Sequence, residues 1–442
     1  MDMHYEGQNN IHKILNNGLI LRSSTPADLD QLIEFNQQIH YFVPDHTNTI
    51  SSMTRDLMSG HLSTFQPQDF LLVVEKNSNK IVSSMALISQ IWQYENILIK
   101  VGRPELVGTD PAFRGKGLIR ELFNVAHEIS KKRGHLIQAI TGIPFFYRQF
   151  GYELGVPLGG GWAGYPPVNN NGKDEILRNN EFTIRQAEVT DLRWIQECYQ
   201  SGCSRYLLSA SRDLNTWCYE ILDKSNTNIH KVDVNAIFST ENQPVGFFIC
   251  PKRFTTSKEI TIIWYDLLPG IPWNAVTVML FHWLWNKSEK DYHRINLMLG
   301  EDHPAYHVGD PFLSEKIEPG AWYIRVADLV SFLLCIVPVL EKRINQSAWS
   351  AFSGNLRISN YRESFYILFD RGKIGSIQPY KLSNWDDADA AFPNLCFLQL
   401  LFGFRSLYDL QYAYPDCWIK PEFTGLIQTL FQKKPSNVWG IA

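Results

Sequence analysis

One stretch decides the fold of this chain: Val107-Gly108-Thr109-Asp110-Pro111-Ala112-Phe113-Arg114-Gly115-Lys116-Gly117-Leu118. An apolar run precedes the stretch and the amphipathic segment 118–131 follows it, so we predict a strand, a glycine-bearing turn and a helix. The first turn of such a helix leaves main-chain N–H groups without partners, and the helix dipole adds partial positive charge there. Beside Arg114 and Lys116, these donors predict a binding site for phosphate groups.

Two familiar phosphate-binding motifs do not fit this stretch. A P-loop needs four residues between its glycines and then Gly-Lys-Ser/Thr, and this spacing is absent. A dinucleotide-binding turn needs G-x-G-x-x-G, whereas Gly115-Lys116-Gly117 runs into Leu118-Ile119-Arg120 without a third glycine. The pattern that remains is Thr-x-Pro-x-x-Arg-Gly-x-Gly-Leu after a strand. An ordinary strand, turn and helix with a basic start is the alternative to a ligand site.

The remaining pattern resembles the coenzyme A pyrophosphate loop of the GNAT N-acetyltransferase superfamily. A second motif, Phe145-Phe146-Tyr147-Arg148-Gln149-Phe150-Gly151-Tyr152-Glu153, resembles the short Phe-Tyr-x-x-Phe-Gly-Tyr/Phe helix of the same superfamily. The resemblance implies acetyl-CoA as co-substrate and no metal. It implies that the acetyl-pantetheine arm contacts Val107, Gly108 and Thr109. It also implies that the pyrophosphate is held by Arg114, Gly115, Lys116, Gly117, Leu118, Ile119 and Arg120.

The catalytic groups follow from the same resemblance. Tyr147 matches the acid that protonates the leaving thiolate, and a phenol with a pKa of about 10 suits this task. A purely packing role for Tyr147 is the alternative, and Tyr152 is the neighbouring candidate. The base implied by the family is the terminal carboxylate, here that of Ala442. A bulge in the strand near Val107 would leave N–H donors free to polarise the acyl carbonyl.

An internal repeat sets the domain organisation, because residues 21–29 recur in pattern at 184–192. The second copy lacks Arg-Gly-x-Gly, and His303 and His307 lack the acidic partner of a helical zinc motif, so we expect it to bind neither coenzyme A nor metal. The layout resembles the enhanced-intracellular-survival type of GNAT acetyltransferase. The predicted units are a catalytic GNAT domain (1–165), a linker (166–180), a degenerate GNAT-like domain (181–319) and a sterol-carrier-protein-like domain (320–442).

The predicted fold class is α/β (α+β), with tandem GNAT-like mixed sheets flanked by helices and a carboxy-terminal α+β domain. The strands near Val107 and Ala139 should run parallel, because a whole helix joins them. Predicted strands cover 70–75, 81–92, 98–107, 136–141, 260–267 and 365–370, and predicted helices cover 118–133, 144–150, 274–285 and 397–407.

Bulk composition narrows the class of partner. A net charge of −4 provides no global basic field for nucleic acid or an anionic membrane. The apolar stretch 329–340 is shorter than the ~20 residues of a membrane span, and the polar start lacks the apolar core of a signal peptide. Seven cysteines without a C-x-x-C pair suggest buried thiols in a reducing cytoplasm.

The sequence therefore predicts an acetyl-CoA-dependent N-acetyltransferase that acts on a primary amine, either a small molecule such as an aminoglycoside or a lysine side chain. A non-catalytic coenzyme A- or lipid-binding regulatory protein is the alternative. Because an amine substrate is cationic before attack, an acidic pocket is expected. Asp28, Glu34 and Asp69 are equal candidates for it, and a solvated surface charge is the alternative for each. The family resemblance also implies a homo-oligomer.

Overall fold

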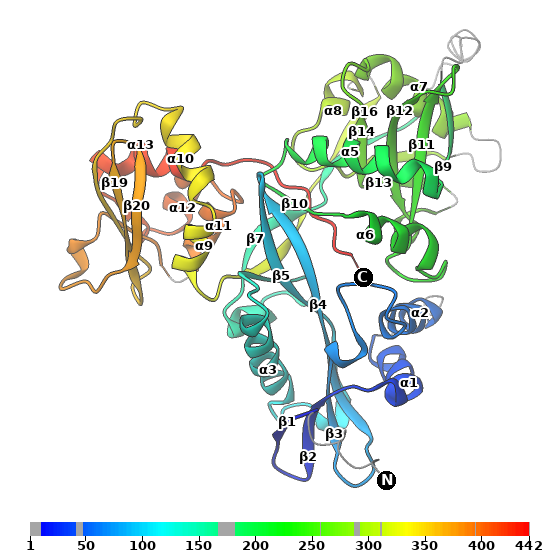
Figure 1. The fold of residues 1–442 in the computed structure, drawn as a ribbon, viewed down its shortest axis with the longest axis horizontal. Coiled ribbons are helices and arrows are strands. Elements are labelled where there is room, and N and C mark those ends of the chain that lie inside the picture. Colours follow the sequence, from blue (N-terminus) through cyan, green and yellow to red (C-terminus); the bar gives the residue numbers. More distant parts are fainter. Residues whose placement is uncertain are drawn as a thin grey trace.

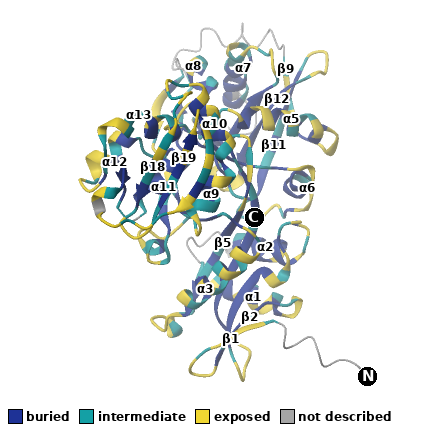
Figure 2. Ribbon diagram, turned by 60° about the vertical axis from the view of Figure 1, so that its left-hand side comes forward, coloured by how far each residue is buried: buried dark blue, intermediate teal, exposed yellow. Residues whose placement is uncertain are grey.

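The computed structural model describes residues 10–40, 47–166, 182–256, 258–286, 292–309, 312–393 and 395–441. The chain forms three lobes, which we call the first, middle and third lobes in sequence order (Figure 1). Each lobe combines sheet and helix, so the predicted mixed α/β class is confirmed. The strands are largely buried, whereas turns and outward helix faces are exposed (Figure 2).

The first lobe is built on a long sheet with helices on both faces (Figure 1). Alternation along one strand explains the two faces, because Leu71 and Val73 pack with α3 whereas Leu72 and Val74 pack with α1 and α2. The helices are α1 (Leu29–Ile39), α2 (Thr47–Met58) and α3 (Leu118–Lys132). In sheet order the strands are β1 (Ile11–Ile14), β2 (Leu19–Ser23), β3 (Phe70–Glu75), β4 (Ile81–Tyr94), β5 (Ile97–Thr109), β6 (Ile137–Ile140), β17 (Gly320–Arg325) and β7 (Glu153–Leu158).

Most first-lobe predictions are confirmed. Strand β3 and helix α3 begin at the predicted residues, and β5 pairs in parallel with β6 through Val101 and Ile137. The short helix predicted at 144–150 is a 3-10 turn, η5 (Phe146–Phe150), which Phe145 enters with a φ of 66°.

The middle lobe contains two four-stranded sheets. One runs β14 (Trp264–Leu267), β12 (Pro244–Pro251), β11 (Val232–Ser239), β9 (Phe182–Gln186), and the other runs β13 (Glu259–Ile262), β15 (Arg294–Leu297), β8 (Gly161–Gly164), β16 (Leu313–Ile317). The helices are α5 (Leu192–Cys203), α6 (Leu214–Cys218), which continues into the π-helix η7 (Tyr219–Asp223), α7 (Trp273–Asn286) and α8 (Pro304–Gly309).

The single strand predicted at 260–267 is wrong. The chain breaks at Ile263, so that β13 and β14 belong to different sheets. The main chain at the break is still satisfied, because Ile263 N–H donates to Ile249 O at 2.9 Å and Asn437 Nδ2 donates to Ile263 O at 3.2 Å. A segment distant in sequence thus supplies the hydrogen bond that the main chain lacks at the break. The local pattern of apolar residues does not indicate this contact.

The internal repeat is real in three dimensions. Arg22 pairs with Asp28 at 2.7 Å in the first lobe, and Arg185 pairs with Asp191 at 2.6 Å in the middle lobe. Each aspartate also accepts from a main-chain N–H three residues before it. The repeated sequence therefore encodes the same helix entry twice.

The sheets do not divide at residues 165 and 320, where the domain boundaries were expected. Strand β8, from the end of the expected first domain, pairs with β15 and β16 of the middle lobe. Strand β17, from the expected third domain, lies between β6 and β7 of the first-lobe sheet. The middle-lobe segment β10 (Leu208–Ala210) extends the same sheet by pairing with β4. The lobes are therefore interlocked through exchanged strands.

The third lobe packs helices against a sheet that runs β20 (Lys373–Pro379), β19 (Ser364–Asp370), β18 (Gly354–Ser359), β21 (Ala390–Ala391), β22 (Trp418–Ile419). Its helices are α9 (Leu329–Cys335), α10 (Val337–Asn345), α11 (Cys396–Leu401), α12 (Leu407–Ala413) and α13 (Pro421–Leu430). The helix predicted at 397–407 ends early, at Leu401, because Gly403 has a φ of 63°, in the left-handed region that ends helices.

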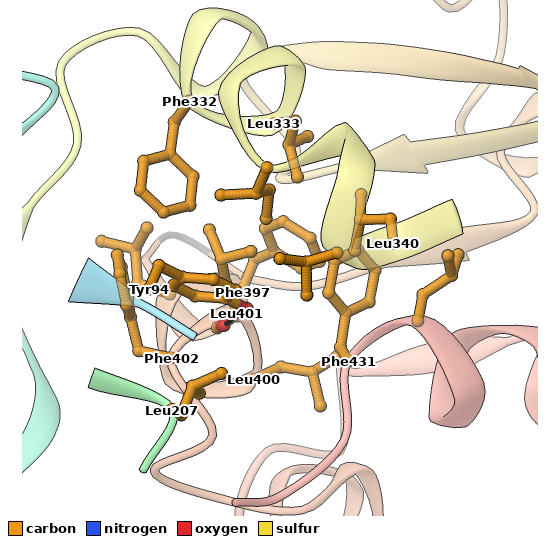
Figure 3. Close-up of a cluster of buried hydrophobic side chains, with 14 of the residues drawn as sticks. Tyr94, Leu207, Phe332, Leu333, Leu340, Phe397, Leu400, Leu401, Phe402 and Phe431 are labelled. Atoms are coloured by element: carbon orange, nitrogen blue, oxygen red, sulfur yellow. Dashed lines mark hydrogen bonds between the residues drawn. The ribbon is translucent and has the colours of Figure 1, made fainter. Parts of the chain in front are cut away.

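A first-lobe tyrosine anchors the third lobe (Figure 3). Tyr94 enters the cluster of apolar side chains, packs edge-on against Phe332 and Phe402, and donates its hydroxyl to Leu401 O at 2.8 Å. Beside this contact, Arg343 of α10 pairs with Glu95 at 2.6 Å. The end of β4 thus connects the two lobes through packing and charge.

Candidate active site

The predicted bulge is present at the end of β5. Between the pairs Ser84–Gly108 and Ala86–Glu105 the register shifts, which places the extra residue at Leu106 and Val107. Leu106 has a φ of 49°, in the left-handed region. The bulge frees this edge of β5 from regular pairing with β4 and turns its main chain toward the neighbouring cavities.

The turn after β5 carries open glycines at the start of α3. Gly115 and Gly117 have φ values of 75° and 76°, and an added Cβ at either would meet nothing within 4 Å. Backbone conformation therefore favours glycine here, and the space outside stays free for a ligand. Among the described residues, no hydrogen bond engages the main-chain N–H groups of residues 115–120. These donors and the α3 dipole form an anion-binding cradle.

A cavity of about 630 Å³ extends from the bulge to this cradle. Its basic side chains are Arg114 and Arg120, and Arg120 is steadied by Gln149 at 3.0 Å. Lys116 does not line the cavity, because its ammonium lies over the Phe113 ring at 4.3 Å. The other predicted coenzyme A residues all line it, namely Val107, Gly108, Thr109, Arg114, Gly115, Gly117, Leu118, Ile119 and Arg120.

Tyr147 lies where this cavity meets a second one of about 260 Å³. Its ring is buried and packs edge-on against Phe123 and Tyr323. Burial, then the nearby carboxylate of Glu105, raises the pKa of the Tyr147 phenol above its usual value. The side chain therefore keeps its proton at neutral pH. The cavities also share His40, Val107 and Ile143.

The second cavity is lined by residues from distant parts of the chain. Glu105 and Tyr147 come from the first lobe, Arg212 and Arg253 come from the middle lobe, and Trp439 comes from the carboxy-terminal segment. The cavity thus exists only when the first and middle lobes and the carboxy-terminal segment meet. Sequence reasoning missed its distal residues, because nothing local connects them to the motif at 107–118.

The carboxy-terminal segment 435–441 leads into the second cavity, which Trp439 and Gly440 line (Figure 1). Asn437 bridges to Ser209 in parallel, and Val438 O accepts from the Trp322 indole at 3.1 Å. At its end Ile441 O accepts from Gln90 Nε2 and from Arg103 Nη1 at 3.1 Å. The predicted base Ala442 lies outside the described residues.

Gly440 fits against a buried arginine. An added Cβ there would lie 2.7 Å from Arg103 Cζ and 2.9 Å from Nε. Arg103 is only 2% exposed, pairs with Glu105 and lies over the Trp322 ring at 5.5 Å. The Arg103 guanidinium therefore cannot move away from a side chain introduced at Gly440. Arg103 and Glu105 lie on the same face of β5 and both line the second cavity, so strand alternation is the one sequence signal that connects them.

The acidic residues proposed for an amine pocket do not line either cavity. Asp28 is occupied by Arg22 and by the turn at Thr25, and Asp69 is held by Arg133 and by Gln66 N–H. Glu34 is exposed and accepts from Gln38 at 3.1 Å. The first two close helix entries instead of receiving a substrate, so this expectation is wrong.

The described residues contain no group of three or more His, Cys, Asp or Glu side chains that could hold a metal ion. Nor does any described helix combine the length and apolar character needed to cross a bilayer. In the middle lobe His303 is buried, with Nε2 3.0 Å from Tyr265 O, and His307 pairs with Asp302. These contacts give both histidines local structural partners.

Comparison with known proteins gives a family match for part of the first lobe and a shared fold for nearly the whole chain. Residues 21–155 match the family model described as an acetyltransferase (GNAT) domain. No curated protein matches the chain. The fold is similar to a GCN5-related N-acetyltransferase from Kribbella flavida, with a TM-score of 0.66, 14% identity and coverage of 96% of this chain and 100% of that chain.

Two further solved structures share the fold along nearly the whole chain. One is a GCN5-related N-acetyltransferase from Anabaena variabilis, with a TM-score of 0.64 and 12% identity, covering 96% of this chain and 99% of that chain. The other is Eis1 from Mycobacterium abscessus, with a TM-score of 0.62, 11% identity and the same coverage.

Proposed function

We propose that this chain, an acyltransferase whose residues 21–155 form a GNAT acetyltransferase domain, transfers the acetyl group of acetyl-CoA to a primary amine. One observation carries the proposal. The bulged end of β5, the open turn before α3 and Tyr147 border a cavity that joins a second, smaller one. The larger cavity suits a long phosphate-bearing acyl donor and the smaller one suits its acceptor.

In the proposed reaction the two substrates meet at the junction of the cavities. The neutral amine nitrogen attacks the thioester carbonyl carbon, the C–S bond breaks, and the thiolate takes a proton from the Tyr147 hydroxyl. The nitrogen loses its proton to a base, and Tyr147 regains one from solvent. Free N–H groups at the bulge near Val107 support the developing oxyanion, and holding both substrates together supplies much of the rate.

Replacing Gly117 tests the donor site. In Gly117→Val the side chain stands in the open space before α3 and strains a positive φ, so we expect acetyl-CoA affinity to fall at least roughly tenfold. Titration calorimetry measures it. Gly134→Val is the matched control, because Gly134 has a φ of 71° in equally open space at the other end of α3. Equal affinity in both variants would argue against the cradle.

The base in this proposal is the carboxylate of Ala442. Its support is the preceding segment, since Ile441 O is fixed by Gln90 and Arg103 beside the second cavity. Adding two glycines after Ala442 moves the carboxylate, so we expect kcat to fall roughly 100-fold without a change in acetyl-CoA affinity. Ala442→Gly keeps the carboxylate and serves as the control. Full kcat in the extended chain would remove Ala442 from the mechanism.

The remaining assignments are also proposals. We infer a sterol-carrier-protein-like third lobe from its α+β architecture, although its apolar helices fill a shared core (Figure 3). The seven cysteines, all of them among the described residues, form no disulfide, which supports a reducing, cytoplasmic location. A homo-oligomer is proposed from the family resemblance, and a non-catalytic coenzyme A or lipid binder is the alternative function. Acetyl-CoA turnover that depends on added amine separates the enzyme from the binder.

A further inference from the structure

The second cavity carries more positive than negative side chains. Arg103, Arg212 and Arg253 line it, against Glu105 and Glu220. Glu105 is engaged by Arg103, so the charge of that pair is balanced. The charge balance at Arg212, Arg253 and Glu220 therefore decides which charged ligand the cavity can bind.

Glu220 balances Arg212 only in part, because it also pairs with Lys224. Its carboxylate lies 2.8 Å from Lys224 Nζ, whereas Arg212 Nη1 is 3.5 Å away. These three side chains are at most 4% exposed, and Arg212 Nε and Nη1 have no hydrogen-bond partner among the described residues. One carboxylate thus serves two cations. A buried guanidinium with unused donors is costly unless an anion completes it.

Arg253 is the second cation of the cavity, and no salt bridge engages it among the described residues. No carboxylate of a described residue lies within ion-pairing distance of its guanidinium, which stacks on Phe254 at 4.4 Å. Although the residue as a whole is exposed, burial of its guanidinium lowers the pKa of Arg253 to about 10; attraction to Glu105 opposes this shift and repulsion from Arg103 adds to it. His230 adds no positive charge at neutral pH, because burial and the nearby cations hold its pKa well below 6.5.

We propose that the acceptor is a small primary amine that carries a carboxylate, an amino-acid-like molecule whose anionic group binds Arg212 and Arg253. The proposal rests on the proposed acetyl transfer and specifies its substrate class. The proposed base at Ala442 would offset one of the two surplus charges and leave the other. The remaining wall includes Ile50, Met53 and Ile229, which suit an apolar body. At about 260 Å³ the cavity favours a small acceptor over a polycationic sugar.

A matched set of amines tests the proposal, with release of the coenzyme A thiol as readout. Leucine, leucinamide and 3-methylbutylamine share an apolar body but differ in the anionic group. We expect kcat/KM for leucine to exceed that of the other two roughly 10- to 100-fold. The phosphonate analogue of leucine separates carboxylate from phosphate-like recognition, and kanamycin represents the polycations. Higher turnover of the phosphonate than of leucine would overturn the carboxylate assignment.

The variant Arg253→Gln tests whether Arg253 causes the expected preference for leucine. We expect kcat/KM for leucine to fall roughly tenfold and that for 3-methylbutylamine to stay within about twofold. Lys252→Gln is the control, because Lys252 is an adjacent cation that does not line the cavity and lies 3.7 Å from Asp233. Arg212→Gln is a second variant with the same expected pattern.

The outcomes separate this inference from the proposed function. Equal turnover of the three matched amines, preference for kanamycin, or an equal loss for all amines in Arg253→Gln overturns the anion site and leaves acetyl transfer intact. If no amine in the panel releases thiol above the rate of acetyl-CoA alone, the proposed function fails and the anion site fails with it.

Discussion

Tyr147→Phe is expected to lower kcat by roughly 100- to 1,000-fold while acetyl-CoA affinity and the unfolding midpoint change little. The aromatic ring keeps its contacts with Phe123 and Tyr323, so the variant removes only the proton that the leaving thiolate needs. Steady-state kinetics and a urea melt measure the three quantities. Full kcat in the variant would restrict Tyr147 to packing.

The pH profile adds a second readout for Tyr147. The acid works only while protonated, and burial with Glu105 raises its pKa, so ionisation of Tyr147 would reduce kcat only above the ordinary phenol value of about 10. Tyr152→Phe is the matched control. The Tyr152 hydroxyl lies 3.1 Å from His127 and lines neither cavity, so kcat should stay within about threefold.

Gly440→Ala is expected to lower the free energy of unfolding by about 2–4 kcal/mol and kcat at least roughly tenfold. The new methyl group would overlap the Arg103 guanidinium, which Glu105 and Trp322 hold in place. The carboxy-terminal segment must then lift, and Ile441 O loses its donors. Urea unfolding and kcat measure the two effects.

A glycine in loose surroundings provides the control for Gly440. At Gly375 in β20 an added Cβ would be 3.8 Å or more from its neighbours, so Gly375→Ala should leave both quantities unchanged. If Gly440→Ala matched this control, the segment 435–441 would not be fixed by Arg103 in solution.

Sequence reasoning succeeded where the signals were local. The end of β5, the open turn and α3 are contiguous, and the spacing of glycine, proline and arginine reports directly on backbone shape. The same holds for the short motif around Tyr147. A turn between a strand and a helix needs no partner from elsewhere in the chain to be recognised.

Sequence reasoning failed where distant segments decide the local structure. The polar residues of the stretch 260–267 are Thr261 and Asp266, and neither adjoins Ile263, so nothing in the local pattern marks the break that Asn437 completes. The sequence leaves Asp28 open between an amine pocket and a solvated surface charge, whereas in the structure it is buried and completes the capping box of Thr25-Pro26-Ala27-Asp28. Similarly, no pattern near Arg103 indicates that Gly440 will cover it.

The position of β17 between β6 and β7 has a consequence for biosynthesis. The two flanking strands leave the ribosome before the whole middle lobe, whereas the strand that joins them comes after it. At about 5–20 residues per second the edge of β6 stays open for roughly ten to thirty seconds during translation. The sheet of the amino-terminal lobe is therefore incomplete until the middle lobe and β17 have been synthesised.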